Sequence, residues 1–326
     1  MRAISLFSGG LDSMLAIKQI TKQNIDVTAL YIYTGFGGTK DVREQLKERA
    51  KMAGADFISV DVREEYIQDI LFDPVYGYGK NFNPCIDCHG YMFKIAKKML
   101  KDLDASFLVT GEVLGQRPMS QRKDALKQVQ KLAEDKEGLI LRPLSAKLLE
   151  PTKPEIEGWV DREQLLDISG RSRERQLALA KEYGWDDYES PAGGCLLTEP
   201  VYSQKIREFI EHESFGVEDI DLLKYGRHFR LPDGAKLVVG RDKDDNEALK
   251  KIENSDYIGF RVPVAGPFSL INKSATAKDK ELAAKIALTY GKSQKEQSYS
   301  VEVAGECYNV TPFNSKEEAQ KYFFNK

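Results

Sequence analysis

The sequence contains no apolar run that approaches the roughly 20 residues of a membrane-spanning helix. Its first residues, MRAISLFSGG, also lack the basic and apolar regions of a secretion signal, so we expect a cytoplasmic chain without a membrane partner. Cysteine is scarce, with four residues in 326, and a structural disulfide is not expected in a reducing compartment. A strong charge imbalance is absent as well, since the net charge of −3 excludes a strongly basic nucleic-acid-binding arm.

Hydrophobic residues make up 41% of the sequence, which is enough for a core, and the length suits two domains. Up to residue 200, short apolar runs alternate with segments of helical periodicity, which predicts an α/β fold with a doubly wound parallel sheet. From residue 201 to 326 the pattern predicts hairpins and short helices in a smaller α+β domain. The predicted strands of the parallel sheet are residues 2–7, 27–34, 56–62, 105–113 and 139–144.

The strongest motif is SGGLDS at residues 8–13, between the first predicted strand and a predicted helix. Gly9 and Gly10 permit a tight turn with exposed backbone N–H groups, and the helix N-terminus adds the positive end of its dipole. Ser8 and Ser13 can donate hydrogen bonds to phosphate oxygens, and Asp12 can hold Mg²⁺. An ordinary capped glycine turn has similar residues, but the position at the end of a parallel strand favours a phosphate site. The P-loop pattern GxxxxGK(S/T) is absent.

SGGLDS resembles the pyrophosphate loop of the PP-loop ATP pyrophosphatases, which have a HUP-type sheet. That superfamily cleaves ATP to AMP and pyrophosphate to adenylate a carbonyl oxygen, so the resemblance implies ATP and Mg²⁺ as cofactors. TGEVLGQRPMSQ at residues 110–121 and LRPL at residues 141–144 resemble elements of ThiI-type tRNA 4-thiouridine synthetases. This resemblance adds Gly111 and Gln116 to the ATP-binding residues. We expect Gln116 and the polar residues up to Gln121 to begin the helix after the fourth strand.

Three of the four cysteines form a candidate site. Cys85 and Cys88 form a CxxC within NPCIDCHGYMFK, just before a helix predicted from His89. This segment resembles the cysteine element of MnmA-type tRNA 2-thiouridylases, in which Cys88 falls on the functional cysteine. That family usually has Asp at the position of Cys85 and Asn at the position of His89. Cys195 follows Gly193 and Gly194 in PAGGCLLTEP, a loop in which the backbone can approach a ligand closely.

The chemistry of these cysteines has three possible forms. The CxxC is closer to thiolases that bind a 4Fe–4S cluster, and Cys85, Cys88 and Cys195 would hold such a cluster with one iron open. A Zn²⁺ site is the second form, with His89 or Cys307 as the fourth ligand. In the third form, Cys88 and Cys195 are catalytic thiols that carry sulfur. Without such a role, Cys307 in a predicted strand is expected to be an ordinary core thiol.

Two groups of basic residues are candidates for RNA binding. Arg171, Arg173 and Arg175 fall at a predicted helix start, where positive charge is unfavourable unless a polyanion meets it; a solvated charged face is the alternative. Residues 222–290 resemble RNA-binding domains of the NFACT-R type, although a small domain that only covers the sheet edge would also fit. The basic face implied by this resemblance consists of Lys224, Arg227, His228, Arg230, Lys236 and Arg241.

The resemblances together imply an ATP-dependent tRNA sulfurtransferase, with a catalytic PP-loop domain at residues 1–200 and an RNA-binding domain at residues 201–326. ATP would adenylate a uridine carbonyl oxygen, and sulfur on the cluster, on Cys88 or on Cys195 would displace AMP, so Asp12 and these two cysteines would be catalytic. The expected partners are tRNA and a separate sulfur donor such as a cysteine desulfurase. The alternatives are a PP-loop amidotransferase or ligase that acts on a small metabolite, and an RNA-binding adaptor with a vestigial ATP site.

Overall fold

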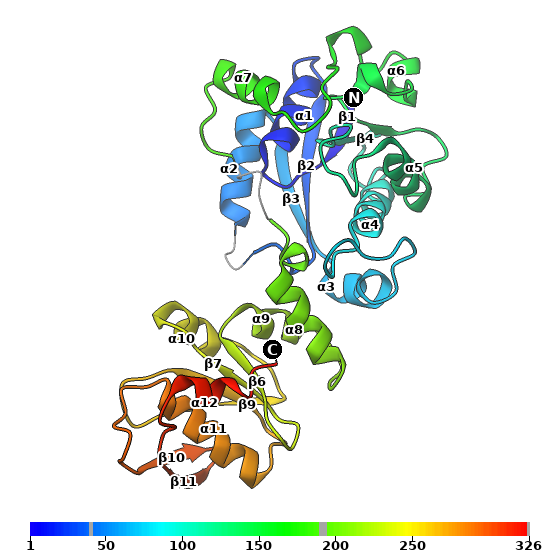
Figure 1. Ribbon diagram of the computed structural model, residues 1–326. Coiled ribbons are helices and arrows are strands. Elements are labelled where there is room, and N and C mark those ends of the chain that lie inside the picture. Colours follow the sequence, from blue (N-terminus) through cyan, green and yellow to red (C-terminus); the bar gives the residue numbers. More distant parts are fainter. Residues whose placement is uncertain (39–41, 189–193, 325–326) are drawn as a thin grey trace. The chain divides into compact units, whose positions relative to one another are not determined.

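The computed structural model describes residues 1–38, 42–188 and 194–324 (Figure 1). The chain divides into two compact units, Met1–Glu199 and Pro200–Lys326, and each is described here by itself. None of the helices in the described ranges combines the length and the apolar character that crossing a membrane requires.

The first unit is built on a five-stranded parallel sheet with the strand order β3-β2-β1-β4-β5. The doubly wound parallel sheet predicted from the sequence is therefore confirmed. Strand order reverses between β1 and β4, and the carboxyl ends of such a strand pair flank the crevice in which these folds bind ligands. The strands are β1 (Arg2–Leu6), β2 (Asp26–Tyr33), β3 (Asp56–Asp61), β4 (Phe107–Thr110) and β5 (Ile140–Leu141).

Helices cover both faces of this sheet (Figure 1). On one face α1 (Leu11–Thr21) packs against α2 (Arg43–Ala53) and α7 (Glu174–Glu182), and on the other α4 (Cys85–Lys98) packs against α5 (Lys123–Leu132). The core between α1 and the sheet is apolar, and α2 ends as predicted at Gly54, whose φ of 92° suits glycine. The shorter elements are α3 (Arg63–Tyr66), a π-helical turn (Ile67–Leu71), α6 (Lys153–Ile156) and 3₁₀ turns at Ala146–Leu148, Arg162–Gln164 and Leu196–Thr198.

Several element boundaries differ from the prediction, and three of them lie in segments with residues predicted for the site. Helix α4 begins at Cys85 instead of His89, because Ile86 and Asp87 are already buried, and the CxxC is thus its first turn. Residues 116–121 form a loop instead of a helix start, since a proline at 118 disfavours helical backbone at the residue before it. Strand β5 ends at Leu141 because the next residues turn away toward Pro143, which has no N–H for a ladder.

The second unit contains a four-stranded antiparallel sheet with the order β6-β7-β9-β8, and a separate hairpin of β10 and β11. The predicted α+β arrangement and its hairpins are confirmed. The strands are β6 (Arg227–Arg230), β7 (Lys236–Val239), β8 (Tyr257–Arg261), β9 (Phe268–Asn272), β10 (Tyr299–Val303) and β11 (Glu306–Val310). The helices are α8 (Pro200–Ile210), α9 (Val217–Lys224), α10 (Lys243–Lys250), α11 (Ala277–Thr289) and α12 (Lys316–Gln320).

The core of the second unit is formed by β6, β7, β9, α11 and the hairpin, and it is separate from that of the first unit. The turn between β6 and β7 contains Gly234 with a φ of 100°, in the predicted Pro-Asp-Gly segment. Cys307 lies in β11 as predicted but is exposed. The expectation of a core thiol is therefore wrong, because every second side chain of this strand points away from the core.

Candidate active site

The SGGLDS loop connects β1 to α1 at the carboxyl edge of the parallel sheet. Gly9 has a φ of 74°, and a Cβ built on it would lie 2.2 Å from a methyl carbon of Leu46, so the turn requires glycine. Gly10 is the N-cap residue of α1, and no side chain caps that end of the helix. The first N–H groups of a helix have no partner within it, and here they are left available for an anion. The hydroxyl of Ser13 donates to the carbonyl oxygen of Gly10 (2.7 Å) and thus stabilises the turn.

A chain of polar side chains surrounds Asp12 next to this helix end. Gln116 Nε2 donates to Asp12 Oδ2 at 2.6 Å, and Gln176 Nε2 donates to Gln116 Oε1 at 3.0 Å. Arg173 Nη2 lies 4.0 Å from Asp12 Oδ1. Asp12 Oδ1 and Arg173 Nε are both buried without a hydrogen-bond partner. An open carboxylate oxygen next to an open guanidinium N–H fits a magnesium ion and the phosphate that it neutralises.

Gln176 belongs to this group although the sequence analysis did not select it. It lies on α7 three residues after Arg173. This spacing places two side chains on one helix face, so the separation from Arg173 was the available signal.

Gly111 contributes to the site through close packing. A Cβ on Gly111 would lie 2.5 Å from the backbone nitrogen of Ser13 and 2.7 Å from the carbonyl oxygen of Asp12. The end of β4 therefore rests directly on the peptide between Asp12 and Ser13, and any side chain at residue 111 would displace the SGGLDS loop.

The three arginines at the start of α7 do not act as one group. Arg173 faces Asp12, whereas Arg175 pairs with Asp167 at 2.6 Å on the surface. Arg171 is exposed. The helix begins only at Glu174, so its acidic first turn relieves the unfavourable placement of positive charge that the sequence suggested.

A buried ion pair lies behind the same edge. Glu112 is 3% exposed, accepts a hydrogen bond from Arg142 Nε (2.9 Å), and lies 2.8 Å from Nδ1 of His89. Burial by itself would raise the pKa of Glu112, but the charge of Arg142 and the contacts with His89 together hold that pKa below its usual value. The ionised carboxylate links α4 to β4 and holds the His89 ring against the loop that follows β4.

The three predicted cysteines come together in the first unit. Asn83 Nδ2 donates to Cys85 Sγ at 3.1 Å, and the Tyr66 hydroxyl donates to the sulfur of Cys88. The backbone N–H of Leu196, next to Cys195, donates to the carbonyl of Phe36 at 2.8 Å. The sequence analysis missed Tyr66, although it lies at the start of a π-helical turn, a feature that often marks functional sites. Gly193 lies outside the described residues.

The pKa values of Cys88 and Cys195 are raised by burial and by neighbouring sulfurs. Burial raises the pKa of Cys88 to about 12, with the Tyr66 hydroxyl opposing the effect and the sulfurs of Cys195 and Cys85 adding to it. Burial raises the pKa of Cys195 to about 11, and the sulfur of Cys85 raises it further. Nearby backbone N–H groups and Arg117 act in the opposite direction and lower this pKa. Both thiols are thus protonated at neutral pH, the form with low nucleophilicity.

Within the described residues, no three His, Cys, Asp or Glu side chains form a group that could hold a metal ion. The predicted zinc site with His89 therefore has no ligand set there, since His89 is engaged with Glu112. The expected cluster at Cys85, Cys88 and Cys195 stays a prediction, since the described residues contain no such metal-binding group there either.

One loop connects the nucleotide edge to the cysteines. Gln116 binds Asp12, and Arg117 is close enough to Cys195 to lower the pKa of that thiol. Asn83, the residue that donates to Cys85, also donates to the sulfur of Met119 at 3.5 Å. The loop at residues 116–119 therefore contacts both halves of the candidate site.

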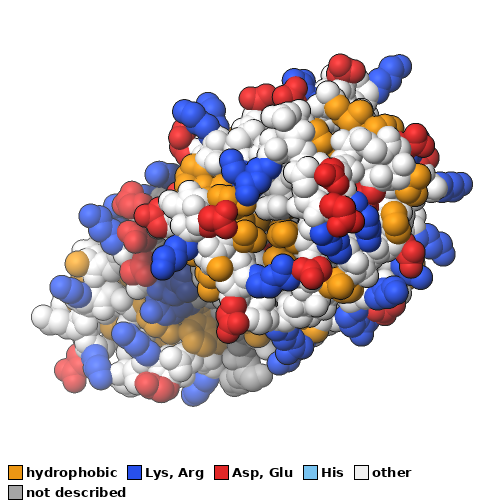
Figure 2. Space-filling view, turned by 90° about the horizontal axis from the view of Figure 1, so that it is seen from above, with side chains coloured by type: hydrophobic (Ala, Val, Ile, Leu, Met, Phe, Trp, Pro, Cys, Tyr) orange, Lys and Arg blue, Asp and Glu red, His pale blue; other side chains and the backbone are white. Residues whose placement is uncertain are grey.

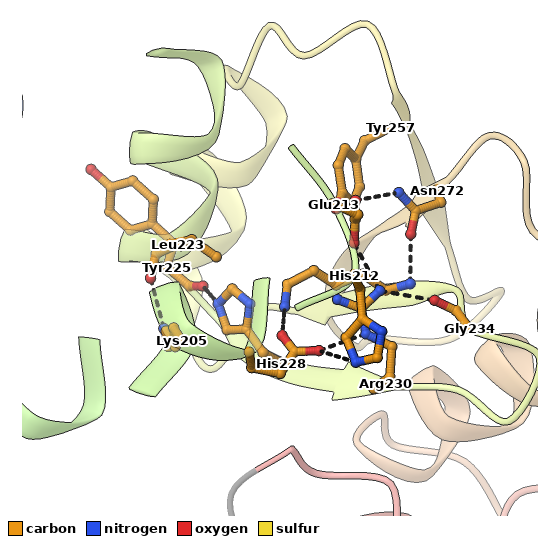
Figure 3. A network of polar contacts seen from close by, with 12 residues as sticks. Lys205, His212, Glu213, Leu223, Tyr225, His228, Arg230, Gly234, Tyr257 and Asn272 are labelled. Carbon is orange, nitrogen blue, oxygen red and sulfur yellow. Dashed lines mark hydrogen bonds and ion pairs between the residues drawn. The ribbon is translucent and has the colours of Figure 1, made fainter. Parts of the chain in front are cut away.

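In the second unit, a buried polar network joins α8 to the sheet (Figure 3). Glu208 accepts a hydrogen bond from Arg230 Nε at 2.5 Å and another from Lys236 Nζ. Glu213 accepts from Arg230 Nη1 at 2.7 Å and from the Tyr257 hydroxyl at 2.9 Å. Two strand cations are thus neutralised by two carboxylates of the α8 segment.

This network contradicts the expected basic face at several positions. Lys236 is fully buried and His228 is almost so, while Arg230 is directed at carboxylates. Burial also lowers the pKa of His228 well below its usual value, so the ring is neutral at pH 7. Lys224 is largely buried and donates to Asp221 at 2.7 Å.

The remaining members of that expected face are also engaged within the second unit. Arg227 donates to the carbonyl oxygen of Gly240 (3.1 Å) and lies 4.7 Å from the ring centre of Tyr290. Arg241 pairs with Asp245 at 2.5 Å but is half exposed. In the view of Figure 2, Lys and Arg side chains are interspersed with Asp and Glu side chains.

Comparisons with known proteins cover both units. The family model described as thiamine biosynthesis protein (ThiI) matches residues 1–181, more than half of the chain. The model described as NFACT protein RNA binding domain matches residues 226–323.

Individual relatives match over shorter stretches. An uncharacterized protein of Methanocaldococcus jannaschii is 34% identical over 115 residues, which are 35% of this chain and 41% of that protein. A probable tRNA sulfurtransferase of Thermococcus kodakarensis is 32% identical over 120 residues, which are 35% of this chain and 30% of that protein. The chain thus spans less than half the length of these two relatives. A crystal structure of a 4-thiouridine synthetase–RNA complex with bound ATP is similar with a TM-score of 0.43 and 19% identity, over 68% of this chain and 52% of that one.

Proposed function

The chain belongs to the ThiI family, and we propose that it is an ATP-dependent tRNA sulfurtransferase. In this proposal the first unit is the catalytic domain, and the second unit captures tRNA as an NFACT-type RNA-binding domain. The substrate is a uridine whose carbonyl oxygen is replaced by sulfur.

The observation that carries the proposal is the loop at residues 116–119. It contacts Asp12 at the SGGLDS loop on one side and the neighbourhood of Cys85 and Cys195 on the other. A reaction that first activates an oxygen with ATP and then replaces it with sulfur needs these two chemistries within reach of one base. A PP-loop ligase for a small metabolite would leave the three neighbouring thiols without a role.

The residues of the first unit divide the work of adenylation. The free N–H groups at the start of α1 and the open side of Arg173 would bind the phosphates of ATP. Asp12 would hold Mg²⁺, which neutralises phosphate charge. The uridine oxygen attacks the α-phosphorus and pyrophosphate leaves, and the N–H groups of the SGGLDS loop stabilise the charge that develops on it.

Cys85, Cys88 and Cys195 would hold the 4Fe–4S cluster, which supplies an iron open to a sulfur ligand. Burial keeps Cys88 and Cys195 protonated at neutral pH, and metal binding would displace these protons because thiols bind metal as thiolates. Tyr66 donates to Cys88 and would continue to do so when that sulfur is a thiolate.

Asp12→Asn tests the adenylation site. The substitution keeps the side-chain size but removes the charge that would hold Mg²⁺, so we expect tRNA-dependent pyrophosphate release to fall on the order of 100-fold or more. Asp26→Asn is the matched control, because Asp26 is exposed at the amino end of β2, and it should retain full activity. Unchanged turnover in Asp12→Asn would contradict the assignment. Mass spectrometry of tRNA nucleosides from a deletion strain should show the loss of one thiolated uridine.

A further inference from the structure

A loop at residues 72–78, here called the Val75 loop, is built directly onto the CxxC helix. Asp87, which lies between the two cysteines of α4, is 2% exposed. It accepts hydrogen bonds from the backbone N–H groups of Val75 (2.7 Å) and Tyr76 (3.1 Å). The hydroxyl of Tyr78 donates to the carbonyl oxygen of Leu71 at 2.8 Å and fixes the other side of the loop.

The end of the Val75 loop is fixed to the cysteine site as well. Gly79 N–H donates to the carbonyl oxygen of Asn83 at 2.9 Å, and the side chain of Asn83 donates to Cys85. A Cβ on Gly79 would lie 2.5 Å from Asn83 Nδ2 and 2.6 Å from Met119 Sδ, so the loop has no space between itself and the site. The Val75 loop is therefore a fixed edge of the cysteine site.

This fixed loop exposes apolar side chains. Val75 is 76% exposed, and Phe72 at the start of the loop is 36% exposed. Because Asp87 holds the backbone of Val75 in place, the side chain cannot fold back onto the core. Apolar side chains held at the rim of a reactive site are typical of a contact with another macromolecule.

The segment that leads into the Val75 loop has several exposed carboxylates. Glu64, Glu65, Asp69 and Asp73 are exposed on the segment that leads into it, and Lys80 is the exposed cation that follows it. The pKa of Tyr91, on α4 beside this segment, is raised to about 12 first by burial and then by Glu65 and Asp69. RNA phosphates are repelled by such a surface. The exposed arginines of the site, Arg117 and Arg171, lie on other segments, after β4 and before α7.

We propose that the Val75 loop and the acidic segment that leads into it dock a separate protein that delivers sulfur to the cysteine site. The docking face of that protein would be apolar at its centre and basic around it, since it must complement Val75 and the four carboxylates. This inference rests on the proposed function, in which the sulfur that replaces the uridine oxygen is supplied at the site of the three cysteines. It assigns the basic edge to tRNA and the acidic, apolar edge to the sulfur donor.

The test compares Val75→Lys with the unaltered full-length chain, both purified anaerobically. The probe is the cysteine desulfurase of the same genome, loaded with persulfide by L-cysteine, and binding is followed by isothermal titration. Lysine removes the apolar contact and places a positive charge against a basic partner, so we expect binding at least about tenfold weaker. Ile156→Lys is the matched control, because Ile156 is another 71% exposed apolar residue of the same unit, and it should bind as the unaltered chain does.

Two further measurements separate the possible outcomes. Sulfide-supported thiolation of tRNA needs no protein donor, so Val75→Lys should retain it, which also shows that the variant is folded. Affinity for tRNA should be unchanged, whereas a lysine on an RNA-binding edge would strengthen it. Any of three results overturns the proposal. The first is equal binding of the desulfurase by Val75→Lys and by the unaltered chain, and the second is no binding by the unaltered chain. The third is stronger tRNA binding by the variant. If the unaltered chain does not thiolate tRNA with sulfide, the proposed function is overturned instead. The comparison of desulfurase binding by the two chains can still be interpreted in that case.

Discussion

At the scale of single residues, the candidate active site contains polar atoms that folding leaves without partners. An unpaired buried polar group costs on the order of 1–3 kcal/mol, so Asp12 Oδ1 and Arg173 Nε are expensive to keep open. Gln116 and Gln176 could have turned to satisfy them, but these amides bind Asp12 Oδ2 and each other instead. The open atoms therefore face a position that a ligand would complete.

The cysteines give the sharpest prediction at this scale. Anaerobically purified protein should be brown and contain about four irons per chain, as a cluster held by three thiolates requires. Cys85→Ala, Cys88→Ala and Cys195→Ala should each bleach the protein, because each removes one of three ligands. Cys307→Ala is the matched control, since this exposed cysteine lies in the second unit, and it should keep the colour. Colourless protein, whether metal-free or with one zinc per chain, would refute the cluster.

Residue roles could be read from the sequence where they depend on local structure. The strand, the glycine turn and the helix start around Asp12 are consecutive in the chain, so this local arrangement was predictable. The roles of Arg230 and Lys236 were not predictable, because their partner Glu208 lies more than 20 positions away on a helix that packs on the sheet. A count of basic residues along a strand does not show which of them face a buried carboxylate.

At the scale of elements, the attachment of α8 to the second sheet is ionic as well as apolar. Glu208 on α8 pairs with Arg230 and Lys236, and Phe209 beside it is buried. Glu208→Gln would leave Arg230 and Lys236 in the interior with Glu213 as the remaining carboxylate of this network. Breaking a buried ion pair by removing one partner costs about 3–5 kcal/mol, so we expect a loss of this size in the free energy of unfolding of the second unit.

This loss can be measured separately in the two units. Both tryptophans, Trp159 and Trp185, lie in the first unit, so their fluorescence should report an unchanged transition in urea. Circular dichroism should show the earlier unfolding of the second unit. Glu247→Gln, which removes an exposed ion pair with Lys250, should have little effect on the free energy of unfolding, because solvent screens such a pair. If Glu208→Gln and Glu247→Gln lower the free energy of unfolding equally, the Glu208 network is not a buried ion-pair network.

The same variant has a predictable pH dependence. Burial raises the pKa of Glu208, but Arg230 and Lys236 outweigh this and hold the pKa below its usual value. A carboxyl with a lowered folded-state pKa stabilises the fold above its unfolded-state pKa and loses that contribution as pH falls through the folded-state pKa. The difference between Glu208→Gln and the unaltered chain should therefore be full at pH 7 and shrink in the acid range below the ordinary pKa of glutamate.

Element positions were predictable from the sequence to within a few residues, with informative exceptions. Strands with apolar runs and helices with apolar faces were found because their periodicity is local. The start of α4 was placed at His89 instead of Cys85, because cysteine and aspartate gave no helical signal before their burial was known. That shift matters for function, since it places Cys85, Asp87 and Cys88 on one helical turn, with the Val75 loop fixed by the middle residue.

At the scale of the whole molecule, two known families meet within one chain. The ThiI match ends at residue 181 and the NFACT match begins at residue 226, so neither includes α8 and α9. The structure assigns both helices to the second unit, and the Glu208 and Glu213 contacts give the physical reason. The second unit thus has an addition of its own before the NFACT-type sheet, with carboxylates directed at two cations of that sheet.

The role of the second unit can be tested by separating the two units. Each unit has its own apolar core, so a chain ending at Glu199 should fold and still bind ATP. If the second unit captures tRNA, this shortened chain should bind tRNA at least about tenfold more weakly than the full chain in a filter-binding assay. Binding by the full chain should also weaken steeply as salt rises, because each phosphate contact releases counterions, and the shortened chain should have a shallower slope. Residues 200–326 alone should bind tRNA. The salt dependence of this binding should account for the difference in slope between the full chain and the shortened chain. Equal tRNA affinity with and without residues 200–326 would move RNA recognition to the first unit, where Arg117 and Arg171 are the exposed cations of the site.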